Sequence, residues 1–370
     1  MLSQPAVFLP APLPRNLEAS FRDLGSARAA TRASAIRDVV RHALRSDATR
    51  ERAIRAFEGA LKGDDTARVR AEAALGLADI HAHEALPALL VAIEDDDAHV
   101  RQMALSALGE IGDRRAAQRL ERALRDERPE VRYQAVIAFA RVAKDEPASV
   151  VAALRRALDD PDDAIRYISM RIAEEQLATT GVTGESPDGP RDPLRDEGLA
   201  ARAEELVDDL DEAIAVVAGL YLARLGRDRG LAVVRDVVAE RRGTPELEDE
   251  QACVELAGEM SLRDAIPHLE HRAWGGRRVV RAVLSWGAGD RASCAWHARI
   301  ALARMGHERA KTEILAELAS WRRETREAAV VAAGRARMRE ARGALENLQN
   351  HGGSVDAALV REALVRLAVD

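Results

Sequence analysis

The chain has 370 residues, of which 47% are hydrophobic and only 3% are aromatic, and its formal net charge is −7. A core of this composition depends on Ala, Leu, Val and Ile, which favours closely packed helices, because strands are enriched in aromatic and β-branched residues. The acidic balance gives no general reason to expect nucleic acid as a partner, and no apolar run approaches the ~20 residues of a membrane span.

The start of the chain differs in composition from the rest. Residues 1–14 contain four prolines and lack the basic start and continuous apolar stretch of a signal peptide. We expect a Pro-rich leader here, followed by a helix from about Ala27 to Arg45. The two cysteines form no CxxC motif, so neither a zinc ribbon nor a disulfide framework is expected, and a cytoplasmic location fits.

Four segments share a pattern that begins with Val-Arg or Ile-Arg. The pairs are Val69-Arg70, Val100-Arg101, Val131-Arg132 and Ile165-Arg166, which begin 31, 31 and 34 residues apart. A period of this length is typical of arrays of helix pairs. In the second segment the apolar residues fall on one stripe at helical spacing, and another amphipathic stretch, residues 85–93, precedes it. Each unit is therefore predicted to contain two antiparallel helices.

The predicted turn between the two helices of each unit is acidic. The acidic runs are Asp64-Asp65, Asp95-Asp96-Asp97 and Asp159-Asp160-Pro161-Asp162-Asp163. Asp in such a turn caps the following helix and is stabilised by the positive end of its dipole. Asp97 precedes Arg101 by four residues, as Asp162 precedes Arg166, which suggests a ladder of carboxylate–guanidinium pairs from repeat to repeat. We interpret this acid as structural, because it recurs in phase with the helices.

The stretch from Asp97 to Gly112 reads DAHVRQMALSALGEIG and resembles the HEAT repeat, in particular the bacterial form that is also found in phycocyanobilin lyase subunits. The resemblance is strong from about Ala53 to Glu175 and weaker afterwards. It implies an all-α fold, a right-handed α-solenoid of antiparallel helix pairs, with roughly nine units that include an N-terminal cap. It also implies that the helices beginning with Val-Arg line the concave side.

The repeat pattern and its interruptions predict the domain organisation. We expect the leader at 1–14, N-terminal HEAT-like repeats at 15–175, a loop insertion at 176–198, and divergent HEAT-like repeats at 199–370. The insertion is rich in Gly, Pro, Ser and Asp, which are typical of loops. A further interruption at about 272–292 delays the next repeat, and the four tryptophans of the chain lie in it or just after it.

Charge is distributed unevenly along the chain. Residues 261–345 contain 17 basic and 9 acidic residues, whereas residues 59–260 contain 26 basic and 43 acidic residues. Trp and Arg are enriched at binding hot spots, so the basic Trp-rich segment is one candidate partner surface. Its candidate contact residues are Trp274, Arg277, Arg278, Arg281 and Trp286. An alternative that stays open is that these tryptophans fill gaps where the repeats are interrupted.

The concave side is the second candidate surface. In the family resembled, positions two, six and nine after the Val of each repeat are partly exposed there. These positions hold Gln102, Ser106, Gly109, Tyr133, Ile137, Tyr167 and Arg171, of which we take Gln102, Tyr133, Ile137, Tyr167 and Arg171 as contact residues. Two tyrosines at equivalent places would supply contact area at little entropic cost.

Catalytic interpretations find little support in the residues. Deoxyhypusine hydroxylase resembles this scaffold and binds iron through His-Glu pairs just after Val-Arg, where this chain has Ala71-Glu72, Gln102-Met103, Tyr133-Gln134 and Tyr167-Ile168. His81, His83 and His99 could meet within one repeat, but no Cys or supporting ligand pattern accompanies them. We therefore expect no metal, no cofactor and no catalytic residue.

The predicted function is a non-enzymatic scaffold or adaptor that binds another protein, of unknown identity, through the concave side, the basic Trp-rich segment, or both. Two alternatives stay open. HEAT-like DNA glycosylases combine Trp, Asp and Arg on a basic concave surface, although the acidic repeats here oppose a continuous track for phosphates. A lyase or chaperone related to phycocyanobilin lyase subunits is suggested by the repeat resemblance alone.

Overall fold

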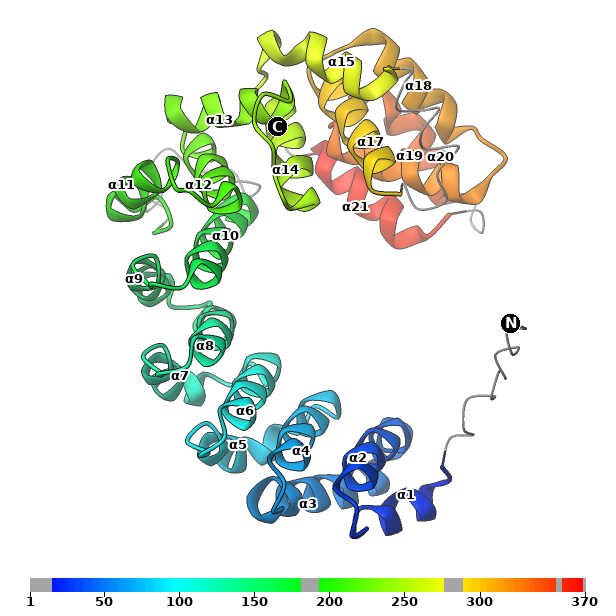
Figure 1. The fold of residues 1–370 in the computed structure, drawn as a ribbon. Helices are drawn as coiled ribbons and strands as arrows, with labels where there is room; N and C mark the ends of the chain where they lie inside the picture. The colour runs from blue at the N-terminus through cyan, green and yellow to red at the C-terminus, as the bar shows by residue number, and fades with distance from the viewer. Residues whose placement is uncertain (1–14, 181–192, 276–288, 351–354, 369–370) are drawn as a thin grey trace, which may run out of the picture. The chain divides into compact units, whose positions relative to one another are not determined.

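The computed structural model describes residues 15–180, 193–275, 289–350 and 355–368, and these residues form α-helices and short 3-10 turns with no strand among them (Figure 1). The predicted leader at 1–14 lies outside this range, as do most of the predicted insertion and the centre of the predicted interruption. The chain divides into two compact units, unit 1 (residues 1–168) and unit 2 (residues 169–370), and the boundary falls within helix α10.

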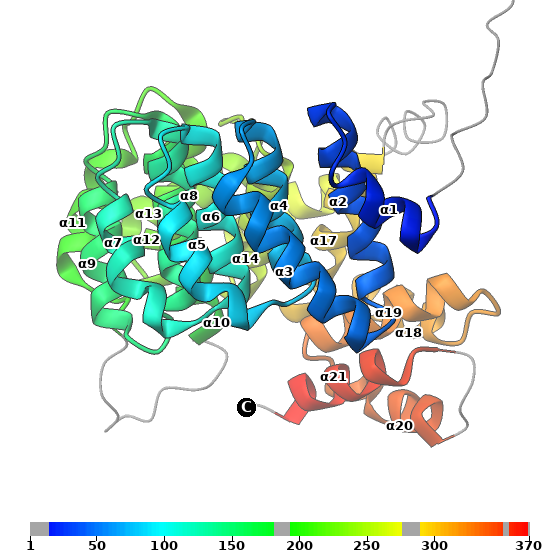
Figure 2. The ribbon, with the colours of Figure 1, turned by 90° about the horizontal axis from the view of Figure 1, so that it is seen from below.

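Unit 1 is built from successive helix pairs. Its helices are α1 (Leu17–Asp23), α2 (Ala29–Ala43), α3 (Asp47–Gly63), α4 (Ala67–Asp79), α5 (Leu86–Ala92), α6 (Ala98–Ile111), α7 (Ala117–Ala123), α8 (Pro129–Val142), α9 (Pro147–Ala157) and the start of α10 (Asp163–Thr180). Short 3-10 turns, His83–Ala85 and Arg114–Ala116, lead into α5 and α7. Figure 2 shows the pairs of unit 1 following one another along the stack.

Unit 2 continues the same plan. Its helices are the end of α10, α11 (Glu197–Leu206), α12 (Glu212–Arg224), α13 (Asp228–Val238), α14 (Leu247–Glu259), α15 (Ile266–Trp274), α17 (Gly289–Arg304), α18 (Glu308–Leu318), α19 (Arg323–Arg335), α20 (Arg342–Asn350) and α21 (Ala357–Ala368). The 3-10 turns Arg263–Ala265 and Arg339–Ala341 lead into α15 and α20.

The prediction of an all-α solenoid of antiparallel helix pairs is confirmed. The described residues contain ten pairs, one more than the sequence predicts, because the repeats after Glu175 carry the signature only in part. The N-terminal helix predicted at 27–45 is α2, and α1 completes its pair. In both units the buried core is almost entirely Ala, Leu, Val and Ile, as the composition predicts.

The second helices of consecutive pairs pack directly on one another. A recurring glycine makes the approach possible: a Cβ at Gly109 would lie 3.0 Å from the Cα of Ala138 on the next second helix. Gly258 has the same relation to Ala301 at 2.6 Å, in unit 2. The first helices touch one another much less, so unit 1 curves with α4, α6 and α8 on its inner side and α3, α5 and α7 on its outer side (Figure 1).

Most second helices end on a residue with a left-handed backbone conformation. After all of these residues except Gly112, the following N–H donates to a carbonyl five residues back, which closes the last turn. Gly112, Gly226 and Gly306 take this place in three repeats, with φ between 70° and 84°. In others the place is held by His81, Ser261 and Arg337, each with φ of 52°. A side chain at such a position is less favourable than glycine, so each of these three residues adopts a backbone conformation that glycine would adopt at lower cost.

Candidate partner-binding surfaces

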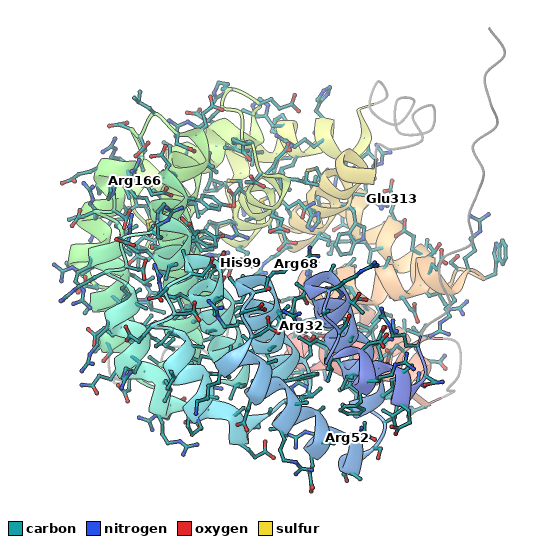
Figure 3. All side chains as sticks on the ribbon, turned by 60° about the horizontal axis from the view of Figure 1, so that its bottom comes forward. Arg32, Arg52, Arg68, His99, Arg166 and Glu313 are labelled. Carbon is teal, nitrogen blue, oxygen red and sulfur yellow. The ribbon has the colours of Figure 1, made fainter. Side chains whose placement is uncertain are left out.

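A ladder of arginine–aspartate pairs fixes the stacking of unit 1. Each ladder arginine donates from Nε and Nη2 to both carboxylate oxygens of an aspartate in the turn of the following repeat, at 2.7–2.9 Å. The pairs are Arg32–Asp64, Arg70–Asp95, Arg101–Asp126 and Arg132–Asp160. Figure 3 labels Arg32 in α2 and Arg166, the equivalent residue of α10. Bidentate geometry of this kind gives register as well as energy.

The predicted ladder exists, but its partners differ from those expected. Arg101 pairs with Asp126 of the next repeat, while Asp97 accepts hydrogen bonds from the N–H groups of His99 and Val100 and caps α6. Asp162 likewise accepts from the N–H of Ala164. A carboxylate that caps its own helix points along the helix axis, so it is the earlier aspartate of each turn that faces the neighbouring arginine.

Hydrogen bonds from the ladder arginines favour the ionised form of the ladder aspartates. Burial alone would raise the pKa of Asp126, but hydrogen bonds from Arg101 and from the N–H of Arg128 lower that pKa below its ordinary value of 3.8. The pKa values of Asp95 and Asp160 are lowered in the same way by Arg70 and Arg132. The ladder therefore uses the recurring geometry of each turn to hold consecutive repeats together.

The second helices of unit 1 present a stripe of partly or fully exposed side chains, here called the inner face. It consists of Glu72, Leu75 and Asp79 on α4, Gln102, Met103, Ser106 and Glu110 on α6, Tyr133, Gln134, Ile137 and Arg141 on α8, and Tyr167 on α10. These residues occupy positions two, three, six and ten after the first apolar residue of each repeat. Positions three and ten were not anticipated from the motif, although helical spacing from position six would have found them.

Four predicted contact residues lie on the inner face. Gln102, Tyr133, Ile137 and Tyr167 are all partly exposed, on α6, α8 and α10. Gly109 is buried, and the expectation that position nine is exposed is wrong, because this glycine contacts Ala138 on the adjacent second helix. Tyr133 and Tyr167 occupy the same position in consecutive repeats, so α8 and α10 each place a tyrosine at the same point of the inner face.

Arg171 belongs to unit 2, where it takes part in a network of ion pairs. Its Nη1 lies 2.6 Å from Oδ1 of Asp249, a residue with no exposed surface, and its Nε lies 2.9 Å from Glu175. Burial alone would lower the pKa of Arg171, but Asp249 and the neighbouring glutamates raise it. This side chain holds α10 to α14 and has little freedom to contact a partner.

Further ion pairs extend this network through unit 2. Glu174, 2% exposed, accepts from Arg224 of α12, which also reaches Glu259 of α14 at 3.2 Å. Arg304 of α17 reaches the same Glu259 at 3.3 Å. The buried charges of unit 2 are therefore paired across several helices. The ladder does not continue at α12, because Ala215 occupies the place of the ladder arginine.

The tryptophans of unit 2 have different environments. Trp274, at the end of α15, donates from Nε1 to Glu313 of α18 at 2.9 Å, and the guanidinium of Arg309 lies 4.0 Å from its ring centroid. Trp274 is therefore packed within unit 2. Trp321, in the turn before α19, is 83% exposed and was not singled out from the sequence. Arg277, Arg278, Arg281 and Trp286 lie outside the described residues.

The remaining chemical groups add no reactive centre in the part of the chain that the structure describes. Both cysteines are buried and free, and burial raises the pKa of the Cys253 thiol far above its ordinary value, so a thiolate is disfavoured there. Across residues 15–180, 193–275, 289–350 and 355–368, no cluster of three His, Cys, Asp or Glu side chains could hold a metal ion. No helix among them is long and apolar enough to cross a membrane.

Comparison with protein families bears out the repeat resemblance. Residues 54–140 match the family of HEAT repeats, a range that covers α4 to α7, most of α8 and two of the four ladder pairs, Arg70–Asp95 and Arg101–Asp126. A comparison with curated proteins gives no significant match. Residues 54–140 are thus similar to HEAT repeats.

Several solved structures are similar at low identity. An engineered protein is 18% identical over 96% of this chain and 99% of its own, with a TM-score of 0.41. The complex of CpcE and CpcF of phycocyanin lyase from Nostoc sp. PCC7120 is 18% identical over 63% of this chain and 96% of its own, with a TM-score of 0.38. A designed armadillo repeat protein in complex with the peptide (KR)4 is 19% identical over 57% and 99%, with a TM-score of 0.40. At these scores the likenesses add nothing to what the helix pairs themselves show.

Proposed function

We propose that this chain is a non-enzymatic, cytoplasmic scaffold that binds another protein through the inner face of unit 1. The observation that carries the proposal is the regular display of side chains along consecutive second helices, with Tyr133 and Tyr167 at equivalent places and Met103 and Ile137 beside them. Rigid aromatic and apolar side chains among polar ones are typical of protein-binding surfaces. An extended segment of a partner protein would meet the same contacts at each repeat.

The charge of the inner face favours a protein over nucleic acid. Glu72, Asp79 and Glu110 lie on the same stripe as Arg141, so acid interrupts any row of basic groups. A nucleic-acid site needs a continuous basic track that neutralises successive phosphates. The mixture of charges instead matches the polar rim and apolar centre of protein interfaces.

A lyase-like activity would need an enclosed apolar pocket for its substrate. The cavity of about 780 Å³ in unit 1 lies between α3 and α5, and its lining includes Glu58, Asp64, Glu94 and Asp96. A site surrounded by carboxylates is poorly suited to an apolar chromophore. This cavity therefore gives no support to a lyase reaction on an apolar chromophore.

We include the C-terminal segment in the proposal as a second contact region. Trp321 exposes 83% of its surface in the turn between α18 and α19, and Trp is among the residues most enriched at hot spots. Arg277, Arg278, Arg281 and Trp286 stay part of the proposal as contact residues, as does Trp274, whose ring packs against Arg309. Loss of binding on changing Trp321 alone would assign partner contact to this region.

Site-specific photocrosslinking tests the inner face directly. A benzoylphenylalanine at position 133 should crosslink a partner protein in the native host, and the same probe in place of Arg122, exposed on the outer helix α7, should not. The partner identified in this way is then titrated against the purified chain. Changing both Tyr133 and Ile137 to serine should weaken its binding at least tenfold, because two central contacts are removed.

Two controls make the experiment decisive. The double variant should retain the circular dichroism spectrum and melting behaviour of the wild type, since both side chains are only partly buried. Equal crosslinking from positions 133 and 122, or unchanged affinity of the double variant, would contradict the proposal. Binding of a duplex oligonucleotide at 0.15 M salt with micromolar affinity, abolished by the same double substitution, would replace the protein partner by nucleic acid.

A further inference from the structure

A cavity in unit 2 has an unusual lining. It encloses about 310 Å³ where the carboxyl-terminal ends of the second helices α10, α12, α14, α17, α19 and α21 come together. Six of its lining side chains are arginines: Arg195, Arg224, Arg304, Arg335, Arg337 and Arg366. Only one carboxylate, Glu259, lies among the lining residues. The cavity is thus strongly cationic within a chain whose net charge is negative.

Among the described residues, four carboxylates pair with four of these arginines, and one of them, Glu174, which accepts from Arg224, is buried outside the lining. Glu259 is shared, because both Arg224 and Arg304 approach it, at 3.2 and 3.3 Å. Arg335 and Arg366 pair with Glu255 and Glu362, which are not part of the lining. A guanidinium has five N–H donors, and an ion pair with a carboxylate outside the cavity does not use all of them.

Arg337 differs from the other cavity arginines in two respects. No ion pair is formed by its side chain within the described part of the chain. Its backbone has φ of 52°, at a place where Gly112, Gly226 and Gly306 stand in other repeats. An arginine in a left-handed position costs of the order of 1 kcal/mol relative to glycine, because of its Cβ atom. His81 and Ser261 hold the same place with the same φ, so the conformation alone does not mark a function, but it means that glycine would fit at position 337.

The arginines also repel one another. Burial lowers the pKa of Arg304, and the nearby Arg337 and Arg366 lower it further, against the opposite effects of Glu259 and Glu255. The structure therefore concentrates cations in a partly buried space, and among them Arg337 has no ion-pair partner in the described part of the chain. An anion that entered this space would relieve the repulsion and gain charge-assisted hydrogen bonds.

The apolar part of the lining restricts the ligand further. Leu177, Leu256, Met260 and Val365 line the cavity beside the arginines, and Val365 is 64% exposed. The volume lies at the lower end of the range for small-molecule sites, about 300–1,000 Å³. A single carboxylate carries one charge, whereas a phosphate monoester carries nearly two and offers three acceptor oxygens to guanidinium forks.

We propose that this cavity of unit 2 binds a phosphate monoester attached to an apolar group. The arginines at the ends of α12, α17, α19 and α21 hold the phosphate, and Leu256, Met260 and Val365 contact the attached group. The same chemistry is found in a free phosphorylated metabolite and in a phosphorylated side chain of a protein. The site is separate from the inner face of unit 1 and does not depend on the function proposed for that face.

Calorimetric titration of the full chain with phenyl phosphate tests the proposal. At pH 8 and low chloride, phenyl phosphate should bind one to one, tighter than inorganic phosphate, which lacks the apolar group, and tighter than benzoate, which lacks the second charge. A tripeptide containing phosphotyrosine distinguishes the two sources. Binding equal to that of phenyl phosphate points to a phosphorylated protein, and exclusion of the peptide points to a free metabolite.

The left-handed backbone of Arg337 allows a variant that removes charge without threatening the fold. Arg337→Gly should weaken phenyl phosphate binding at least tenfold, yet melt at the same temperature as the wild type or above it, because glycine suits φ of 52°. Arg337→Lys should retain most of the affinity. Arg361→Gln, which removes an exposed charge from α21 outside the cavity, is the matched control and should bind normally.

Two results would overturn the proposal. The first is phenyl phosphate binding no tighter than benzoate at the same ionic strength. The second is unchanged affinity in Arg337→Gly, or an equal loss in Arg361→Gln, since either would place the anion away from the cavity or reduce it to a general effect of net charge.

Discussion

Arg101 of unit 1 and Arg171 of unit 2 both lie on second helices, yet they pair across very different stretches of chain. Arg101 reaches Asp126, 25 residues away, in the turn of the next repeat. Arg171 reaches Asp249, 78 residues away, and Arg335 reaches Glu255 from 80 residues away. Unit 1 therefore repeats one short-range contact, whereas unit 2 ties distant helices together.

The difference follows from how closely the repeats resemble one another. Where consecutive repeats keep the same turn and the same Val-Arg start, stacking brings each arginine to the next aspartate in the same way. Once the repeats diverge, as at Ala215, charges on the second helices are satisfied by whichever helix packs against them. The first arrangement gives a uniform surface, and the second creates singular features such as the arginine-lined cavity of unit 2.

The largest expected effect comes from the buried pair of unit 2. Asp249→Ala leaves the guanidinium of Arg171 in a largely buried place without its main partner, which should destabilise unit 2 by about 3–5 kcal/mol. Hydrogen exchange measured by mass spectrometry on the full chain should show faster exchange in peptides from α10 and α14 than in peptides from α6. Glu248→Ala, an exposed neighbour on the same helix, is the control. Exchange identical to that of wild type would contradict a structural role for the pair.

A smaller effect is expected at the helix–helix contacts made by glycine. A Cβ at Gly258 would lie 2.6 Å from the Cα of Ala301, closer than the 3.0 Å between Gly109 and Ala138. Gly258→Ala should therefore destabilise the chain by about 1–3 kcal/mol, and Gly109→Ala by less. Urea denaturation measures both, and equal effects would mean that unit 2 relaxes as easily as unit 1.

A glycine free of such contacts supplies the control for this comparison. Gly59 lies within α3, and a Cβ there would meet nothing within 4 Å. Gly59→Ala should stabilise the helix by up to about 1 kcal/mol, because alanine loses less backbone entropy on folding.

The smallest effect is expected from acid acting on the ladder of unit 1. The pKa of Asp126 is lower in the folded chain than its ordinary 3.8, so as pH falls the unfolded chain binds the proton first. Its stabilising contribution is complete above that ordinary value and is lost as pH falls through the lower folded-state pKa. In Arg101→Gln, the free energy of unfolding measured in urea should fall less steeply between pH 6 and pH 3 than in the wild type. Arg122→Gln, an exposed change of equal charge on α7, should leave the slope as in wild type.

Much of unit 1 was predictable because its determinants are local. The spacing of Val100 and Val131 predicts the repeat, and the acidic turns predict the helix caps that Asp97 provides. The partial exposure of Tyr133 and Ile137 was expected from the resemblance to HEAT repeats. The burial of Gly109 was not, since it depends on the distance to Ala138 of another helix, and a periodic pattern contains no information about that distance.

The sequence by itself determined the helix pairs, their period and the side chains that each second helix presents, because these follow from contacts within about 35 residues. Only the tertiary structure decided which aspartate pairs with each arginine, and which arginines of α12, α17, α19 and α21 share one cavity. The physical reason is that an ion pair forms between charged groups that lie close together in space, whatever their separation along the chain. Proximity between distant repeats is set by the small rotations that accumulate as the helix pairs stack.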